Sequence, residues 1–570
     1  MATNFLYKRI LIVSILIILV GGGILTKLFF LQVVRANQYE NKAESQYVLD
    51  PGTQFSRGSI FFTTKDEELI SAATVVSGYK VALNPSKLLD IEKAYQILLP
   101  YLKISKEVFI ERAEKDNDVY EEVAIHLSEN DAAEIRAQSL PGISLYRDTW
   151  RFYPGGTLGS QITGFVGYKG DTFTGRYGIE QKYNAILGGA EDAPSVNFFA
   201  EVFANLREIV THENKKQGDV VTTIDPYMQA TLETALLGVQ ETWSSEKVGG
   251  IIINPHTGEI VAMANTPSFD PNTYGEVTNQ KAFSNGIVED VFEIGSVMKT
   301  ITMASGLDAG VITESSTYKD TGPLMIDKKQ IRNVEDKYYG ITPMQTILSK
   351  SLNTGATFIM QKLGRNRFRE YMERFGFAEK TGIDLPGEAE NLIGNLYATR
   401  DVEYATASFG HGIAVTPISA VRAFSVIANG GYLPTPHVVK EIRWEDGTVE
   451  KMEYEKGQQV ISKETSDIVR RMMVTVVDKE LLGGTLKFKH YTAGSKTGTA
   501  QLPDPTTGKY SEDRYLHTMY AFFPGYEPKY LVFMYNVNPR GVEYASKTLS
   551  KPVFDVGEAI LTYYNISPDR

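Results

Sequence analysis

The sequence has no cysteine, and this excludes several kinds of site at once. Disulfides, thiolate-bound zinc, iron–sulfur clusters and a lipid-modified cysteine anchor all require a residue that the chain lacks. An excess of basic residues is also missing, because 58 Lys and Arg stand against 69 Asp and Glu, for a formal net charge of −11. Nucleic acid is therefore disfavoured as a main partner, since phosphate contacts need clustered basic side chains.

The composition that is present predicts a folded protein of several parts. The chain has 570 residues, of which 42% are hydrophobic and 11% aromatic, which argues against general disorder. At this length we expect two to four folding units rather than one domain.

One long apolar run, residues 10–34, predicts an uncleaved transmembrane anchor. Its uncharged part, residues 10–26, is close to the lower limit of ~17–25 residues for a spanning helix. Lys27 can extend its amine to the interface and lengthen the span. A cleaved signal peptide is the alternative, but its apolar region is only ~7–15 residues and ends in a small-residue cleavage site, for which we see no convincing candidate.

Residues 293–300 predict an activated serine at the start of a helix. Gly295 allows a sharp turn, so that Ser296 falls in the first helical turn, where unpaired backbone N–H groups can face a developing oxyanion. Lys299 follows three residues later, which places its amine on the same helix face as the serine hydroxyl. The lysine can act as a base only if its pKa is low enough to keep it neutral.

A Ser-x-x-Lys sequence is weak evidence alone, because it recurs at residues 244–247. The order of three motifs is stronger: Ser-Leu-Asn at 351–353 and Lys-Thr-Gly-Thr at 496–499 follow Ser296. Serine β-lactamases and penicillin-binding proteins share this set. On these motifs the chain resembles a class B penicillin-binding protein, a peptidoglycan D,D-transpeptidase. One difference is Ile294, where the family usually has proline.

The resemblance extends to segments before the motifs. Residues 57–61, 150–156 and 175–180 are similar to the family's non-catalytic pedestal. Arg151 and Glu180 either form an ion pair there or are two unrelated solvated side chains.

The family fold is mixed α/β (α+β), and we expect four parts in this chain. These are a cytoplasmic tail at 1–9, a transmembrane anchor at 10–34, a dimerisation-type pedestal at 35–218 and a transpeptidase domain at 219–570. The last has a central antiparallel sheet flanked by helices. The polar, turn-rich segment 211–219 marks the boundary between the two large domains. The resemblance places a single-pass protein in the cell membrane with its catalytic domain outside.

For the reaction, the resemblance implies acyl transfer without a metal or an organic cofactor. Ser296 attacks the carbonyl between the terminal D-alanines of a peptidoglycan stem peptide, and Lys299 takes its proton. Ser351 relays a proton to the leaving amine, although a helix cap is the alternative role for this serine. Lys496 is a second cation that favours the neutral form of Lys299. Which group is the base in this superfamily is disputed.

Four residues are implied in substrate binding. Asn353 offers an amide to the peptide groups of the substrate. Thr497 and Thr499, with the lysine before them, hold the terminal carboxylate, and the N–H groups of the nucleophile and Thr499 form the oxyanion hole. Gly498 allows a ligand backbone to approach closely.

Three functions are compatible with these motifs. A membrane-anchored transpeptidase would be a target of β-lactam antibiotics and would work with a SEDS-type glycan polymerase and division proteins. A serine β-lactamase shares the motifs but has no use for a pedestal, and a non-enzymatic division scaffold has no need of intact motifs. Residues 351–388 and 409–417 are more similar to division-type members. His411, where the family commonly has glutamine, is interpreted as a structural residue.

Overall fold

A computed structural model describes residues 19, 21–23, 27, 55–116, 118–170, 172–188, 217–455, 457–504 and 506–570. Two compact units are present: one contains Val76–Trp150, and the other contains Ser56–Val75 and Arg151–Arg570. Among the described residues, no helix combines the length and apolar character that crossing a bilayer requires. The anchor predicted at 10–34 lies almost wholly outside the described residues and stays a prediction.

The smaller unit packs three α-helices against strands around its own hydrophobic core. Each of its three α-helices begins at a side-chain cap, supplied by Asp90, Ser105 and Ser128. Ser128, for example, caps the last helix and shares a capping box with Asp131. The elements are β2 (Leu69–Leu83, which contributes to both units), η2 (Pro85–Lys87), α3 (Ile91–Leu98), η3 (Leu99–Tyr101), α4 (Lys106–Ala113), β3 (Glu121–Leu127), α5 (Glu129–Ala137) and β4 (Ile143–Phe152).

A five-stranded antiparallel sheet organises the larger unit, as the sequence predicts. Its order is β16-β17-β18-β8-β9, so β16, which carries the Lys-Thr-Gly motif, is an edge strand. Strands β8 and β9 form an antiparallel hairpin. The strands are β8 (Lys247–Ile253), β9 (Ile260–Asn265), β16 (Gly494–Pro503), β17 (Tyr510–Phe523) and β18 (Tyr530–Val537).

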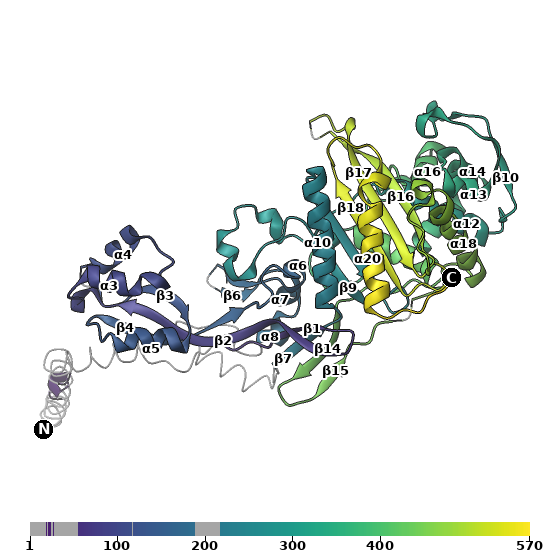
Figure 1. Cartoon of the computed structure of the whole chain (residues 1–570). Helices are drawn as coiled ribbons and strands as arrows, with labels where there is room; N and C mark the ends of the chain where they lie inside the picture. Colours follow the sequence, from purple (N-terminus) through teal and green to yellow (C-terminus); the bar gives the residue numbers. More distant parts are fainter. Residues whose placement is uncertain are drawn as a thin grey trace, which may run out of the picture. The chain divides into compact units, whose positions relative to one another are not determined.

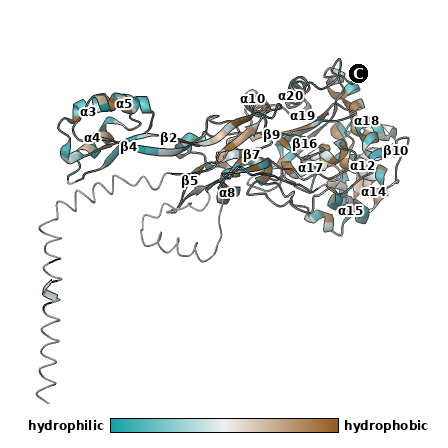
Figure 2. Cartoon of the chain, turned by 90° about the horizontal axis from the view of Figure 1, so that it is seen from below, coloured by the Kyte–Doolittle hydropathy of each residue, from teal (hydrophilic) through white to brown (hydrophobic). Residues whose placement is uncertain are grey.

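Hydrophobic side chains cover both faces of this sheet, because successive strand residues point to opposite sides. Met519 and Ala521 face one core with α10 (Pro226–Trp243) and α20 (Ser550–Tyr563). Tyr520 and Phe522 belong to the other core, with α12 (Lys299–Asp308), α17 (Pro417–Ala428) and α18 (Lys463–Lys479). Figure 1 shows α10 and α20 on one side of the strands, and Figure 2 shows hydrophobic residues gathered in the interior, α17 included.

Shorter elements complete the helical side and hold the nucleophile and the Ser-x-Asn motif. They are η4 (Pro271–Glu276), η5 (Gln280–Phe283), α11 (Gly286–Glu289), η6 (Gly295–Met298), β10 (Thr317–Asp320), β11 (Leu324–Ile326), β12 (Lys329–Ile331), η7 (Val334–Asp336), β13 (Gly340–Pro343), α13 (Met344–Ser349), α14 (Asn353–Leu363), α15 (Arg365–Arg374), η8 (Gly394–Tyr397), α16 (Asp401–Ala407), η9 (Leu481–Gly484) and α19 (Ala545–Thr548).

A second group of strands joins the segments before and after residue 218. Strand β1 (Ile60–Thr63) pairs with β2 and, in parallel, with β7 (Gly218–Thr222), which pairs with β14 (Val439–Trp444). The boundary predicted at 218/219 therefore falls at a strand that is paired on both sides, and it stays a prediction. The accompanying elements are β5 (Val166–Lys169), β6 (Thr172–Gly175), α6 (Ser160–Thr163), α7 (Gly178–Lys182), α8 (Asn184–Gly188) and β15 (Val449–Lys451).

Of the two alternatives for Arg151 and Glu180, the structure shows the ion pair, and a second arginine joins it. Arg151 Nε and Arg57 Nε each lie 2.6 Å from a carboxylate oxygen of Glu180. Tyr153 donates its hydroxyl to the same carboxylate at 3.2 Å. Burial alone would raise the pKa of the Glu180 carboxyl, but the two arginines hold it below its usual value. The pedestal segments are thus joined by a buried charged network.

Candidate functional site

Ser296 and Lys299 meet at the junction of η6 and α12, as the sequence predicts. Lys299 Nζ lies 2.9 Å from Ser296 Oγ. Gly295, with φ +63°, turns the chain into the helix, and a Cβ there would lie 2.9 Å from the carbonyl oxygen of Thr499. Glycine is required at this position because both the backbone conformation and the space exclude a side chain.

The Lys299 amine is enclosed, with its side chain only 1% exposed. Besides Ser296 Oγ, its Nζ contacts the carbonyl oxygen of Ser351 at 2.5 Å and Ser351 Oγ at 3.1 Å. Burial and, secondarily, the charge of Lys496 lower the pKa of Lys299 well below its ordinary value. A neutral amine has two N–H donors and one lone pair, so it can donate to both Ser351 oxygens and accept from Ser296. The geometry suits a general base.

Lys496 enters the same cluster from the edge strand β16. Its side chain is 3% exposed, and its Nζ lies 3.1 Å from Ser351 Oγ and donates to the carbonyl oxygen of Thr497 at 2.9 Å. Burial lowers the pKa of Lys496 to about 7. Ser351 Oγ therefore touches both lysines and links them.

Ser351 is not a helix cap. Helix α14 begins at Asn353, and Leu352 occupies the N-cap position without a side-chain cap. Ser351 has φ +56°, a left-handed conformation that costs a non-glycine residue roughly 1–2 kcal/mol. This conformation lets its carbonyl oxygen and its hydroxyl both face Lys299. The strained backbone of Ser351 thus places the oxygen atoms that the two lysines contact.

Gly498 is approached by the nucleophile loop, which differs from the expectation that a ligand backbone fills this space. A Cβ at Gly498 would lie 2.6 Å from the carbonyl oxygen of Ile294 and 2.4 Å from Thr518 Oγ1. Thr518 also donates its hydroxyl to Ile294 O at 2.8 Å. The glycine therefore lets β16 pack directly on the loop that carries Ser296.

The other predicted substrate-binding residues surround the same cluster but have protein partners. Asn353 Nδ2 donates to the carbonyl oxygen of Arg332 at 2.7 Å. Thr499 Oγ1 accepts the backbone N–H of Ala545 at 3.2 Å. Thr497 is half-buried beside Lys496 on β16. Their binding of a substrate stays a prediction.

The contacts that fix the loop carrying Ser296 are not predicted by the sequence. Glu293 accepts the backbone N–H of Gly412 at 2.9 Å and the hydroxyl of Tyr510 at 2.8 Å. Gly410, with φ +84°, accepts the N–H of Gly295 at 3.1 Å. Glu293 lies three residues before Ser296, and this position is the one sequence signal for a role in the site. No sequence pattern pairs it with Tyr510, 217 positions away.

His411 is buried beside this cluster and packs against Phe409 and Tyr510. Burial and the charge of Lys299 lower the pKa of the imidazole to about 4, so it is neutral at physiological pH. No contact with Ser296 or Ser351 is found for it among the described residues. Its structural role stays the prediction.

The second Ser-x-x-Lys sequence has different geometry. Ser244 ends α10 with φ 47°, whereas Lys247 begins strand β8 and pairs with Asp290. No helix carries both residues, so nothing directs that lysine onto that serine. Lys247 belongs to the five-stranded sheet, where it lies opposite Val537 of β18.

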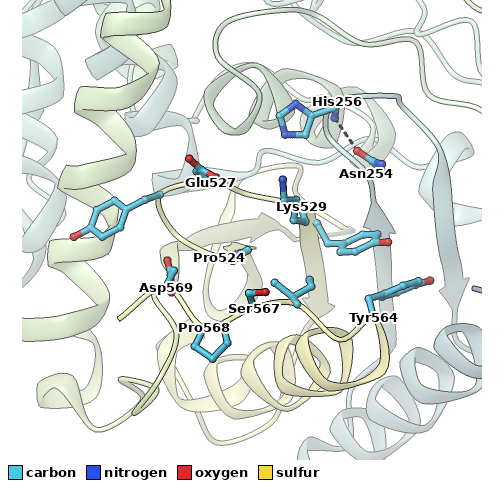
Figure 3. Close-up of a pocket in the computed structure, with 12 residues that line it drawn as sticks. Asn254, His256, Pro524, Glu527, Lys529, Tyr564, Ser567, Pro568 and Asp569 are labelled. Carbon is cyan, nitrogen blue, oxygen red and sulfur yellow. Dashed lines mark hydrogen bonds between the residues drawn. The ribbon is translucent and has the colours of Figure 1, made fainter.

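A surface cavity of about 820 Å³ lies beyond the end of β17, away from Ser296. Figure 3 shows His256, Glu527, Lys529, Tyr564 and Asp569 around it. None of the candidate catalytic residues lines this cavity. Across the described residues, no group of three His, Asp or Glu side chains is arranged to hold a metal.

Two family descriptions match the chain in sequence order. The Penicillin-binding Protein dimerisation domain matches residues 55–223. The Penicillin binding protein transpeptidase domain matches residues 248–556. This range contains the four residues that lie together in the site: Ser296, Lys299, Ser351 and Lys496.

Individual relatives agree with these matches. Stage V sporulation protein D of Bacillus subtilis (strain 168) is 30% identical over 557 residues, covering 96% of this chain and 84% of the relative. Peptidoglycan D,D-transpeptidase FtsI of Escherichia coli (strain K12) is 27% identical over 438 residues, covering 76% and 71%.

Solved structures show the same fold. Penicillin binding protein 2X from Streptococcus thermophilus superposes with a TM-score of 0.71 at 21% identity, covering 90% of this chain and 80% of the other. Penicillin binding protein 3 from Mycobacterium tuberculosis, in complex with aztreonam, superposes with a TM-score of 0.69 at 21% identity. This match covers 90% of this chain and 97% of the other. With its dimerisation domain, its transpeptidase domain and a Ser-Lys pair at 2.9 Å, this chain belongs to the class B penicillin-binding proteins.

Proposed function

We propose that this protein cross-links peptidoglycan stem peptides as a D,D-transpeptidase, through an acyl-enzyme on Ser296. The observation that carries the assignment of Ser296 is the 2.9 Å contact with Lys299, a buried amine whose pKa is strongly depressed. A serine hydroxyl becomes an effective nucleophile when a neutral base can accept its proton.

In the acylation step, Ser296 Oγ attacks the carbonyl carbon between the two terminal D-alanines, and its proton passes to Lys299 Nζ. A tetrahedral oxyanion forms and faces the backbone N–H groups at the start of η6 and on β16. The C–N bond then breaks. Ser351 Oγ, which lies 3.1 Å from both lysine amines, relays the proton to the departing D-alanine amine.

In the second step, the amine of another stem peptide attacks the ester carbonyl and releases Ser296. The proton it loses returns through Ser351 and Lys299 to the serine oxygen. Lys496 supplies positive charge at the edge strand β16, where the terminal carboxylate of the donor peptide is to be held. Asn353, Thr497, Gly498 and Thr499 complete the proposed binding surface.

A serine β-lactamase is the closest alternative, and the surroundings of the cluster favour the transpeptidase. Within the described residues, the hydrogen bonds of Lys299 and Lys496 go to serine oxygens and backbone carbonyls. The nearby carboxylate of Glu293 is engaged by Tyr510 and Gly412. A β-lactamase needs a base that activates a water beside the ester.

We further propose the cellular setting. The apolar run at 10–34 supports a single-pass protein in the cell membrane with its catalytic unit outside the cell. A relative named FtsI and the division-type character of residues 351–388 and 409–417 support a septal role. A SEDS-type glycan polymerase and division proteins are the proposed partners, and β-lactam antibiotics the proposed inhibitors.

The test is an exchange assay with a synthetic stem pentapeptide and a labelled D-amino acid as acceptor. We expect release of D-alanine and incorporation of the label, both abolished by Ser296→Ala. The matched control is Ser244→Ala, which alters the other Ser-x-x-Lys sequence and should leave exchange unchanged. Exchange that survives Ser296→Ala, or release of D-alanine to water alone, would contradict the proposal.

A further inference from the structure

We propose that Glu293 and Tyr510 form a latch that positions the oxyanion hole. The latch ties the loop that carries the nucleophile to the β16–β17 hairpin. Glu293 is then a positioning residue of the acyl-transfer reaction, and this inference rests on the proposed function. Neither side chain contacts Ser296 or either lysine among the described hydrogen bonds.

The carboxylate of Glu293 joins three segments that are distant in the sequence. It lies three residues before Ser296, it accepts Gly412 N–H at 2.9 Å, and it accepts the Tyr510 hydroxyl at 3.0 and 2.8 Å to its two oxygens. A hydrogen bond to a carboxylate is stronger than one between neutral groups. Burial raises the pKa of Glu293, against the opposing effect of these hydrogen bonds.

Backbone contacts already hold the loop on its inner side. Phe292 and Val415 exchange both backbone hydrogen bonds, at 3.0 and 2.9 Å. Gly295 N–H donates to Gly410 O at 3.1 Å. The side chain of Glu293 continues this row of contacts through Gly412 and extends it to the hairpin.

The hairpin is the element that must be held still. Strand β16 carries Lys496 and Thr499, and among the described strands it pairs on one edge only, with β17. Midway along the hairpin, Thr518 fixes β17 to Ile294 O. Tyr510, the first residue of β17, makes the corresponding contact toward the hairpin tip. The two contacts together set the angle of β16 relative to Ser296, and hence the distance between the N–H groups that receive the oxyanion.

The latch lies outside the hydrophobic core, so a change in the latch can alter the position of the hairpin without disrupting the core. The Tyr510 side chain is 51% exposed. Its ring meets the imidazole of His411 edge-on, with centroids 6.1 Å apart and an interplanar angle of 79°. Because the pKa of His411 is about 4, this contact adds no positive charge beside the latch at neutral pH. Removal of the Tyr510 hydroxyl therefore leaves the hydrophobic core intact, while it takes away one of the hydrogen bonds that oppose the raised pKa of Glu293.

The test compares Glu293→Gln, Tyr510→Phe and the double variant in the full chain. The control is Tyr526→Phe, the same change at a tyrosine that is 47% exposed near the other end of β17. Three quantities are measured with a β-lactam: the dissociation constant before acylation, the acylation rate at saturation, and the carbonyl stretching frequency of the acyl-enzyme. That frequency falls as the oxyanion hole polarises the carbonyl more strongly.

We expect each single variant to lower the acylation rate about tenfold, with the dissociation constant and the melting temperature unchanged. The carbonyl band should move to higher frequency, and the double variant should be no slower than the worse single variant, because the two residues act as one unit. An unchanged band and rate, additive losses, or a rate loss explained by unfolding would overturn the latch. Absence of acylation at Ser296 in the unaltered protein would instead overturn the proposed function.

Discussion

Lys299 and Lys496 bring two amines into one buried cluster, at 1% and 3% exposure. Taking an ammonium out of water favours its neutral form, and a second cation nearby adds to the effect. Each amine contacts Ser351, and only Lys299 reaches Ser296. Burial therefore lowers the pKa of Lys299, so that its amine is neutral and has a free lone pair to accept the proton of Ser296 in the proposed reaction.

The pH dependence of acylation follows from this. Lys496, whose pKa is about 7, loses the charge proposed to hold the substrate carboxylate as the pH rises, so the rate should fall at alkaline pH. Acylation also requires neutral Lys299, so the rate should first rise with pH through the pKa of that amine. Because that pKa is depressed, the inflection should lie well below 10.5. Lys299→Met removes the amine but keeps the chain length, and should slow acylation by ~10²–10⁴.

The measurement is the second-order acylation rate from pH 5 to 10. Lys463→Gln, at a lysine of the exposed face of α18, is the control and should reproduce the unaltered profile. An inflection near the ordinary lysine pKa, or full activity in Lys299→Met, would contradict the role of this base.

At the scale of elements, the buried Arg57–Glu180–Arg151 network joins β4, α7 and the entry to β1. Glu180→Gln would leave two buried guanidinium groups without their counter-ion, at a cost of roughly 3–5 kcal/mol. Glu129→Gln removes one partner of the exposed Arg147 pair at 3.7 Å, and should cost at most about 1 kcal/mol. Chemical denaturation of both variants measures the difference. Equal losses would mean that the buried network is not specially stabilising.

Two glycines give a matched pair of alanine substitutions. Gly498→Ala forces a Cβ against Ile294 O and Thr518 Oγ1, and should cost roughly 1–3 kcal/mol while slowing acylation. Gly238, inside α10, has open space around its Cβ position, so Gly238→Ala should stabilise by ~0.5–1 kcal/mol through helix propensity. Thermal unfolding and the acylation rate are compared. A neutral Gly498→Ala would refute the tight packing of β16 on the nucleophile loop.

Elements with strong local signals were predictable from the sequence. Ser128 and Asp131 form a capping box that indicates the start of α5, and the turn residues at 255–258 indicate the β8–β9 hairpin. The Ser296–Lys299 contact followed from the helical spacing of the Ser-x-x-Lys motif. The Glu293–Tyr510 contact could not be predicted, because it depends on how a hairpin folds back over a loop more than two hundred residues away.

At the scale of the whole molecule, the segments before residue 189 contribute to the same core as the catalytic segments. Ten buried hydrophobic residues from this part belong to the larger core: Ile60, Phe62, Ala72, Ala73, Tyr153, Ile162, Phe165, Ile179, Tyr183 and Leu187. A fragment that starts at residue 219, the sequence-predicted boundary, loses all of them and the strand that pairs with β7. Apolar surface that is buried in the full chain becomes exposed to water in this fragment. Each Å² of lost burial removes about 25 cal/mol of stabilising free energy.

We therefore expect residues 56–570 to unfold cooperatively and residues 219–570 to unfold at lower temperature or without cooperativity. Calorimetry of both fragments, with penicillin labelling as the check on the active site, distinguishes them. Equal melting temperatures and equal labelling would show that the boundary at 218/219 separates independent domains.

The central claim is that Ser296 forms a stable acyl-enzyme because the site is built for an amine acceptor. Peptide mass mapping after treatment with a penicillin, followed over hours, tests it most directly. We expect a single adduct on the peptide that contains Ser296, retained over hours, with Ser244 unmodified. An adduct on any other residue, or loss of the Ser296 adduct within seconds, would contradict it.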